Sequence, residues 1–382
     1  MRYRVTCLTP LLVGDGRKLA PIDYMVWKDQ VNVLDQRRIF RLLAKGPRLE
    51  GYLVQLKKAE KLDFASWGGF AQNYADRRIP FESPAYSTYW NRASGESLHI
   101  PTFAAGPSGP YLPGAAIKGA LRTGMLAANW RSNMLREVAA RLEGERPPRR
   151  PAESLEEQAL GPAGADRMRL VSTSDSAAVS NAQFKIYLLR VSTLQARGAG
   201  SYALGWKLSP RGAVDGAKPE ESTPVFAEMA MPGVSFEGDW REHNFFLQPD
   251  VRRMVRWQES FSRARIFDAA NDYAAKLLAL HKQYAAWAGL SLLGVQIEAL
   301  EQKLAEARQA GSCLLSLGWG SGLLGKSAWL DTADPEYRQV LGHLSLYSRA
   351  LSSTLPFPKT RKVVFLNNKP ATLPGWVLLE IL

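Results

Sequence analysis

Alternating apolar and polar residues predict a β-strand at the amino end of the chain. Between residues 2 and 9 the apolar side chains fall on one face, and Pro10 ends the run. Residues 24–34 then fit two short strands, and Asp35 is placed to cap a helix that runs to Ala44. Strands followed by helices in this way predict an α+β fold.

Another helix is predicted to begin at Pro113 and Gly114, with apolar residues at helical spacing up to Leu142. Lys118 and Arg122 lie one turn apart near its amino end, on another face. Cations there oppose the helix dipole, at a cost of about 0.3–1 kcal/mol each when exposed, unless an anion occupies the site. Two interpretations stay open, namely a bound phosphate or a pair of solvated side chains.

The remaining segments carry less regular patterns. Strands are predicted at residues 169–173 and 183–191 and as a pair within residues 224–240, and one or two amphipathic helices are predicted between residues 250 and 288. Residues 144–166 are rich in Pro, Arg, Glu and Gly, which predicts a solvated linker.

Charge indicates the class of partner. The chain has 382 residues, with 49 Lys and Arg against 36 Asp and Glu, and a formal charge of +13. Such a field attracts polyanions, so RNA, DNA or an anionic membrane surface would fit. No apolar run approaches the roughly 18 residues that a membrane span needs, and Asp15 interrupts the amino-terminal apolar stretch. We therefore expect a soluble, cytoplasmic protein.

Cysteine and histidine give little sign of metal chemistry. Cys7 and Cys313 lie in alternating apolar segments, where buried, reduced thiols are expected. No two of the four histidines have the spacing of metal ligands. Neither a metal nor a cofactor is predicted.

The run from residue 314 to residue 327 has two incompatible interpretations. From Gly320 it matches Gly-x-x-x-x-Gly-Lys-Ser, the phosphate-binding loop of nucleotide hydrolases. Such a loop needs a strand before it and a helix after it. The strand is predicted at residues 313–317, but turn-forming residues follow Ser327 and little chain remains for further parallel strands. A nucleotide hydrolase is therefore only a remote alternative.

The second interpretation is a cradle for a nucleic-acid backbone. Glycines at alternate positions remove side chains and let backbone amides approach a phosphodiester. Trp319 could stack on a base or pack in the core, and Lys326 adds charge. The glycines concerned are Gly318, Gly320, Gly322 and Gly325.

Four landmarks in order resemble the RAMP superfamily of type III CRISPR effectors. They are residues 9–16, residues 111–122, residues 317–327, and residues 355–361 followed by Gly375 and Trp376. The resemblance implies tandem ferredoxin-like domains, related to RNA-recognition motifs, with helical insertions. It implies an N-terminal domain over residues 1–180, and a C-terminal domain over residues 181–382 that holds a helical region at about 250–310 and the glycine-rich loop.

The resemblance also implies a function. It indicates a noncatalytic guide-RNA-binding subunit of a type III-A complex, the Csm complex, that caps the filament at the 3′ side of the guide RNA (crRNA) and supports crRNA maturation. The implied partners are crRNA, target RNA, other Csm subunits, especially the backbone RAMP subunit, and trimming nucleases. The implied RNA-binding residues are Lys118, Arg122, Gly318, Trp319, Gly320, Gly322, Gly325, Lys326, Lys359 and Arg361.

A RAMP endoribonuclease that cuts target RNA or guide precursor is the main alternative. Target cleavage in the family uses a loop aspartate, and precursor cleavage uses general acid–base chemistry, typically with a histidine. No candidate has a partner whose spacing identifies an active site, so no catalytic residue is assigned. The candidates are Asp15, Asp23, Asp35, His99, His243, His281 and His343.

Overall fold

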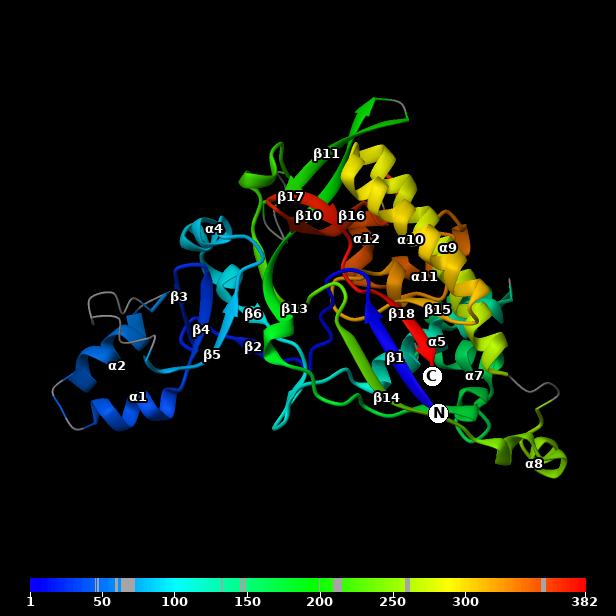
Figure 1. The fold of residues 1–382 in the computed structure, drawn as a ribbon. Helices are drawn as coiled ribbons and strands as arrows, with labels where there is room; N and C mark the ends of the chain where they lie inside the picture. The colour runs from blue at the N-terminus through cyan, green and yellow to red at the C-terminus, as the bar shows by residue number, and fades with distance from the viewer. Residues whose placement is uncertain are drawn as a thin grey trace.

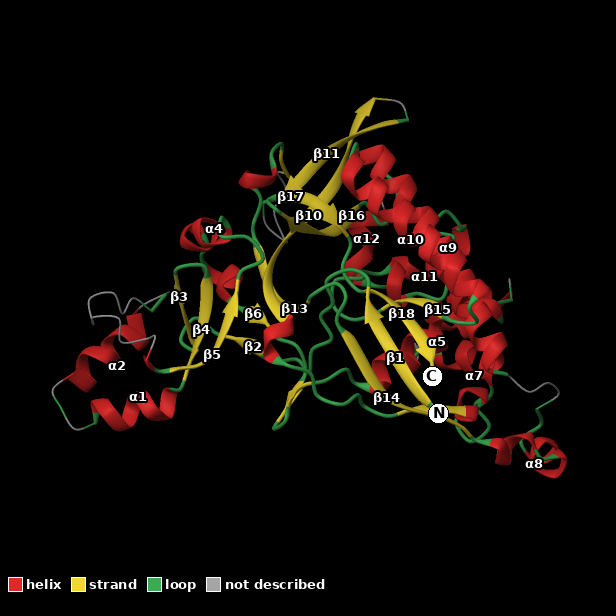
Figure 2. Ribbon diagram, in the orientation of Figure 1, coloured by secondary structure: helices red, strands yellow, loops and turns green. Residues whose placement is uncertain are grey.

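The computed structural model is a mixed α and β protein with two main antiparallel sheets (Figure 1, Figure 2). The α+β class predicted from the sequence is therefore confirmed at this level. The residues that the structure describes are 1–44, 46, 48–58, 61–62, 73–131, 133–144, 146, 149–198, 200–208, 215–257, 262–351 and 355–382.

The first sheet has five strands in the order β15-β18-β1-β14-β9. The predicted amino-terminal strand is its central member, with three buried side chains on one face and the carboxy-terminal strand paired beside it. The sheet therefore joins strands from both sides of the predicted boundary at residue 180, and that boundary does not separate two independent sheets. The strands are β1 (Arg2–Cys7), β9 (Val171–Thr173), β14 (Ser235–Glu242), β15 (Cys313–Ser316) and β18 (Trp376–Ile381).

The second sheet is built around one long strand, β10 (Phe184–Gly198). Its order is β12-β11-β10-β16-β17, and β13 also pairs with β10. All its strands come from the part of the chain after residue 180. The other members are β11 (Ser201–Lys207), β12 (Asp215–Gly216), β13 (Val225–Ala230), β16 (Thr360–Leu366) and β17 (Lys369–Thr372).

Three helices pack together beside the first sheet. Helices α9 (Arg263–Ala288) and α10 (Ser291–Gln309) form a hairpin, and α5 (Gly114–Ala128) packs against α9. Gly124 is the point of closest approach, because an added Cβ there would lie 2.8 Å from the Cα of Ala270.

The predicted helix from Pro113 to Leu142 is two helices in the structure, because α5 ends at Asn129 and α6 (Asn133–Glu143) follows. The predicted linker at residues 144–166 contains helix α7 (Glu153–Leu160), and its residues 145, 147 and 148 lie outside the described part. Between residues 250 and 288 there are two helices, α8 (Pro249–Met254) and α9, with residues 258–261 outside the described part.

A small lobe stands apart from the two sheets, at the left of Figure 1. Its strands are β3 (Tyr24–Trp27), β4 (Gln30–Leu34) and β5 (Ala75–Pro80), and its helices are α1 (Gln36–Leu43) and α2 (Arg48–Lys58). As predicted, the Asp35 side chain caps α1 by accepting the amide of Arg38. Arg77 of β5 joins the lobe to β13 through an ion pair with the buried Glu228, at 2.7 Å.

The remaining elements are short. They are β2 (Lys18–Leu19), β6 (Ile100–Pro101), β7 (Ala105–Gly106), β8 (Gly109–Pro110), α4 (Tyr86–Arg92), α11 (Pro335–Gly342) and α12 (Ser345–Leu351). None of the described helices has both the length and the apolar character to cross a membrane.

Candidate nucleic-acid interface

The glycine-rich loop follows β15, and its backbone conformation requires glycine at several positions. Gly318, Gly320 and Gly322 have positive φ angles of 74°, 97° and 71°. A Cβ on Gly318 would lie 2.2 Å from the Leu12 carbonyl oxygen, and one on Gly320 would lie 2.7 Å from Pro374. These two glycines therefore allow a close approach of the chain to itself, a reason that the sequence pattern did not indicate.

The other two glycines of the loop differ. A Cβ on Gly325 would lie 2.6 Å from the Cβ of Ser321, whereas a Cβ on Gly322 would meet no atom within 4 Å. Gly322 is thus the member of the set whose surroundings are open.

The loop lacks the helix that a nucleotide-hydrolase loop needs. Leu324–Lys326 form a single 3-10 turn, and the next α-helix, α11, begins only at Pro335. Without a helix amino terminus directed at the loop, the phosphate-binding geometry of those enzymes is missing.

Two cavities flank the loop. One, of about 530 Å³, is bounded by residues 12–18, α5 and the loop, and the other, of about 600 Å³, lies between the loop and β16. Ser316, Trp319, Ser321 and Lys326 line both. The loop is therefore the ridge between two hollows.

Three lysines from distant parts of the chain converge at this ridge. Lys362 of β16 holds its Nζ 3.6 Å from the centroid of the Trp319 ring. Burial, together with the charges of Lys326 and Lys18, lowers the pKa of Lys362 to about 8. In the described part of the chain, no carboxylate lies within 4.0 Å of any of the three ammonium groups. We call Lys18, Lys326 and Lys362 the lysine cluster.

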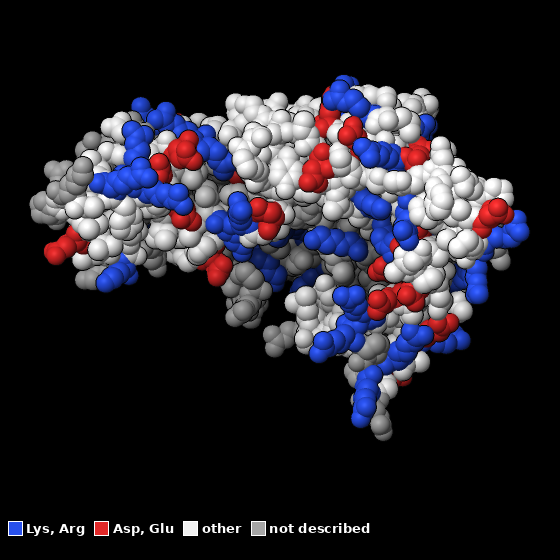
Figure 3. Space-filling view, turned by 90° about the horizontal axis from the view of Figure 1, so that it is seen from below, with Lys and Arg blue, Asp and Glu red and all other residues white. Residues whose placement is uncertain are grey.

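The surface around the hollows carries further cations. Figure 3 shows Lys and Arg side chains along the borders of the concave lower face. Arg17 lines the first cavity and also contacts Asp15, at 3.3 Å. The lysine cluster, which has no carboxylate partner among the described residues, therefore gives this concave surface the electrostatics of an anion-binding site.

Sequence reasoning found Lys326 but missed Lys18 and Lys362. Lys362 follows Arg361 directly, and neighbouring strand residues point to opposite faces. The β16 strand could therefore have indicated that the two cations have different surroundings, although both line the second cavity. No local pattern marks Lys18, since its position beside Lys362 is created by the fold.

Trp319 packs in the core, one of the two roles that the sequence left open, and its stacking on a base stays a prediction. Its amide donates to the Leu12 carbonyl at 2.7 Å, and its ring packs partly buried against the core. The ring also lines both cavities and supports the Lys362 ammonium. An aromatic surface next to a cation suits a nucleobase and its phosphate.

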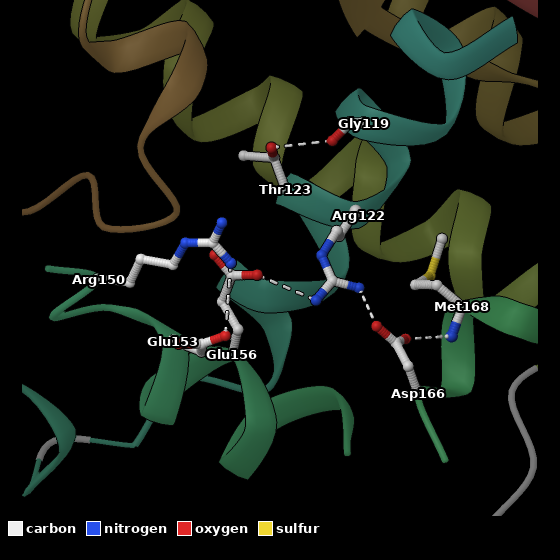
Figure 4. Close-up of polar contacts among 8 residues, drawn as sticks. All are labelled: Gly119, Arg122, Thr123, Arg150, Glu153, Glu156, Asp166 and Met168. Carbon is white, nitrogen blue, oxygen red and sulfur yellow. Dashed lines mark hydrogen bonds and ion pairs between the residues drawn. The ribbon is translucent and has the colours of Figure 1, made fainter. Parts of the chain in front are cut away.

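Arg122 is held by carboxylates of the chain itself (Figure 4). Its guanidinium pairs with Glu156 of α7 at 3.0 Å and with Asp166, which also accepts the amide of Met168 at 2.8 Å. Burial lowers the pKa of the neighbouring Lys118, and the Asp166 charge opposes that shift. Neither of the two open interpretations, a bound phosphate or solvated side chains, describes Arg122, because carboxylates of the protein itself hold it. The contact of Lys118 and Arg122 with RNA is untested, and for Arg122 this pairing leads us to expect a structural role instead.

Arg361 lines the second cavity together with Lys362, and its guanidinium contacts side chains of α9. Its Nε donates to Nδ1 of His281 at 3.0 Å, and its guanidinium lies 4.5 Å from the centroid of the Tyr284 ring. Burial lowers the pKa of Arg361 to about 10. Lys359 precedes β16, where its carbonyl accepts the amide of Leu194 at 2.9 Å. Their predicted RNA contacts also stay predictions.

The candidate catalytic aspartates each bond to nearby backbone. Asp15 accepts the amide of Arg17 at 3.0 Å, Asp23 accepts the amide of Ala20 at 2.7 Å, and Asp35 caps α1.

Of the histidines, His281 is buried, and burial beside Arg361 lowers its pKa well below the usual range. His243 contacts the hydroxyl of Ser172 at 3.0 Å. Among the described residues, no group of three or more His, Cys, Asp or Glu side chains is placed to hold a metal ion.

Comparison with known proteins identifies the fold. A family model described as the RAMP superfamily matches residues 4–324. A chain in the cryo-EM structure of a Csm–crRNA–target RNA ternary complex, from a type III-A CRISPR-Cas system, is similar over 100% of both chains, with 19% identity and a TM-score of 0.70. The crystal structure of T. onnurineus Csm5 is similar over 98% of this chain and 99% of its own, with 15% identity and a TM-score of 0.59. A search among curated proteins gives no match.

Proposed function

The chain belongs to the RAMP superfamily, and from this premise we propose that it is a guide-RNA-binding, noncatalytic subunit of a type III-A CRISPR ribonucleoprotein. In this proposal it caps the subunit filament at the 3′ side of the crRNA and supports crRNA maturation. Its partners are crRNA, target RNA, the other Csm subunits, above all the backbone RAMP subunit, and trimming nucleases. The finer expectation of two ferredoxin-like halves belongs to the same proposal.

The lysine cluster is the observation that carries the RNA-binding part. Three ammonium groups lie near one another at the ridge, although burial and, after it, their mutual repulsion lower the pKa of Lys362. Repulsion between the three ammonium groups raises the free energy of the unbound protein. A bound polyanion reduces that repulsion. A sugar-phosphate backbone supplies negative charge at a spacing that several lysines can share.

The full-length likeness supports the assembly part. Both similar structures match this chain nearly end to end, so the chain has the size and fold of a Csm subunit. The first of them is a complex of Csm proteins with crRNA and target RNA. The noncatalytic part is supported by the roles of the candidate residues, because the three aspartates bond to backbone and His281 is buried beside a cation.

Copurification with the other subunits of its complex tests the assembly part. We expect the tagged chain to retain a defined RNA together with other Csm subunits. Recovery of the chain free of RNA and of other subunits would contradict this part of the proposal.

Incubation of the purified chain with labelled guide precursor and with complementary target RNA tests the noncatalytic part. We expect binding without cleavage, and RNA incubated with Asp15→Ala or His281→Ala should likewise stay uncleaved. Cleavage that disappears in one of these two variants would establish the endoribonuclease alternative instead.

A further inference from the structure

We propose that the first cavity takes a single unstacked nucleotide of the bound RNA, with its base inside the cavity and its phosphate at the lysine cluster. The inference rests on the proposed function and deepens it. A backbone cradle alone needs only a positively charged surface, yet here a hollow of about 530 Å³ opens directly beside the cations. That volume falls within the range of small-ligand pockets, roughly 300–1,000 Å³.

The walls of the cavity suit a planar, polar base. The α5 side is made of small residues, Ala116, Gly119 and Ala120, which leave room for a flat group. Hydroxyl groups stand among them on three different segments. Those of Thr102, Thr123 and Ser321 donate to backbone carbonyls and keep lone pairs that can accept a hydrogen bond from a base edge. The hydroxyls that line the cavity belong to Thr102, Thr123, Ser316 and Ser321.

Charge is placed where the phosphate of such a nucleotide would lie. Lys18 lines the cavity, Lys326 lines both cavities from the ridge, and Lys362 lines the second cavity. An inserted base would therefore have its own phosphate at the ridge and the next part of the RNA chain over the second hollow. Trp319, which lines both cavities, is placed to stack on a base.

Gly119 offers a way to close this cavity without disturbing the core. It lies within α5, lines the cavity, and an added Cβ would meet no atom within 4 Å. The carboxylates that hold Arg122 are on another side of α5, as Figure 4 shows. A larger side chain at position 119 is therefore expected to occupy the hollow while the helix remains intact, since leucine favours a helix more than glycine does.

The first measurement uses the unchanged full-length chain. A series of single-stranded RNAs, each with one abasic position and all with the full set of phosphates, is compared by dissociation constant. We expect one position at which removal of the base weakens binding about tenfold, because stacking and base contacts are lost while charge is kept. Equal affinities at every abasic position would overturn the inference.

The second measurement compares Gly119→Leu with Gly294→Leu. Gly294 is also a helix glycine whose added Cβ would meet no atom within 4 Å, and it lies in α10, away from the cavity. We expect Gly119→Leu to bind unmodified RNA about tenfold more weakly than Gly294→Leu and to lose its sensitivity to the abasic position. Equal binding by the two variants would overturn the inference.

The two levels of the proposal fail in different ways. If the unchanged chain binds no RNA at all, the proposed function fails. The chain could instead bind RNA with an affinity that falls as salt rises, show equal affinity for every abasic RNA and be unaffected by Gly119→Leu. In that case only the proposal of a nucleotide in the first cavity fails. Insertion of a protein side chain from a neighbouring subunit would be indicated if Gly119→Leu impaired subunit association while RNA affinity stayed unchanged, and that result also contradicts the inference.

Discussion

Arg122 and the lysine cluster are both cationic, but carboxylates of the protein neutralise only Arg122. Arg122 pairs with Glu156 and Asp166, and so ties α7 and the following turn to the helix. The lysine cluster has no carboxylate within 4.0 Å among the described residues. Basic side chains of one protein therefore have different roles, because carboxylates of the fold reach Arg122 and do not reach the lysine cluster.

The difference separates cations that stabilise the protein from cations that are available to a ligand. An internal ion pair has already exchanged its water for a partner, so an RNA phosphate would have to displace a carboxylate. In a cluster of like charges, any bound anion lowers the electrostatic free energy by reducing the repulsion between the charges. RNA affinity should therefore depend on the lysine cluster, and fold stability should depend on Arg122.

The largest effect is expected from replacing the whole lysine cluster by alanine. If each lysine makes one phosphate contact worth about 1 kcal/mol, the dissociation constant for single-stranded RNA rises on the order of 100-fold. Binding titrations at fixed salt provide the measurement. The control removes the same charge from the α9–α10 hairpin, at Lys276, Lys282 and Lys303, and should change the constant less than threefold. Equal losses in both triple variants would show that only net charge matters.

Arg122→Ala should have the opposite effect to the lysine-cluster variant, because it should lower fold stability and leave RNA affinity nearly unchanged. Its loss leaves Glu156 and the largely buried Asp166 without their partner, so the free energy of unfolding falls by about 1–3 kcal/mol. Urea denaturation gives this value. Arg136→Ala removes an exposed ion pair with Glu336 and should cost less than about 1 kcal/mol. The RNA affinity of folded Arg122→Ala should stay within threefold of that of the unchanged protein. A larger loss of affinity would support the contact of Arg122 with RNA that the resemblance implies.

A smaller effect is expected from pH. A rise in pH should lower RNA affinity and should increase the contribution of Lys362 to the free energy of unfolding. The pKa of Lys362 is about 8 in the free protein, below its ordinary value of 10.5. A bound phosphate favours the charged ammonium, so RNA affinity should fall severalfold as pH rises from 7 to 9.

The unfolded chain holds this proton more tightly than the folded protein does. The contribution of Lys362 to the free energy of unfolding should therefore increase as pH rises from about 8 to 10.5. Lys362→Ala should remove both dependences. If that variant keeps the pH dependence of RNA binding, another group causes it.

The sequence predicted local elements well where a single pattern controls them. The amino-terminal strand follows its alternation, and α1 begins where Asp35 can cap it. The pattern failed at Asn129, because apolar spacing continued across the break between α5 and α6 and hid it. The linker composition of residues 144–166 likewise hid α7, which buries Leu155, Ala159 and Leu160 in the core and pairs its Glu156 with Arg122.

The candidate site could be predicted only in part for the same reason. Lys326 and Trp319 belong to one continuous loop and were found from its motif. Lys18 and Lys362 come from the two ends of the chain and meet only because β16 and the segment after β1 approach the loop. The pairing of Arg122 was also invisible, since Glu156 and Asp166 lie far along the chain in segments without a clear pattern.

The salt dependence of RNA binding tests the central claim most directly, because it counts the phosphate contacts that a variant has lost. Each contact to a single strand contributes about 0.7 to the slope of log affinity against log salt. With the lysine cluster replaced by alanine the slope should become shallower by about 2, whereas with Arg122→Ala it should not change. An unchanged slope without the lysine cluster, together with a shallower slope for Arg122→Ala, would contradict the account.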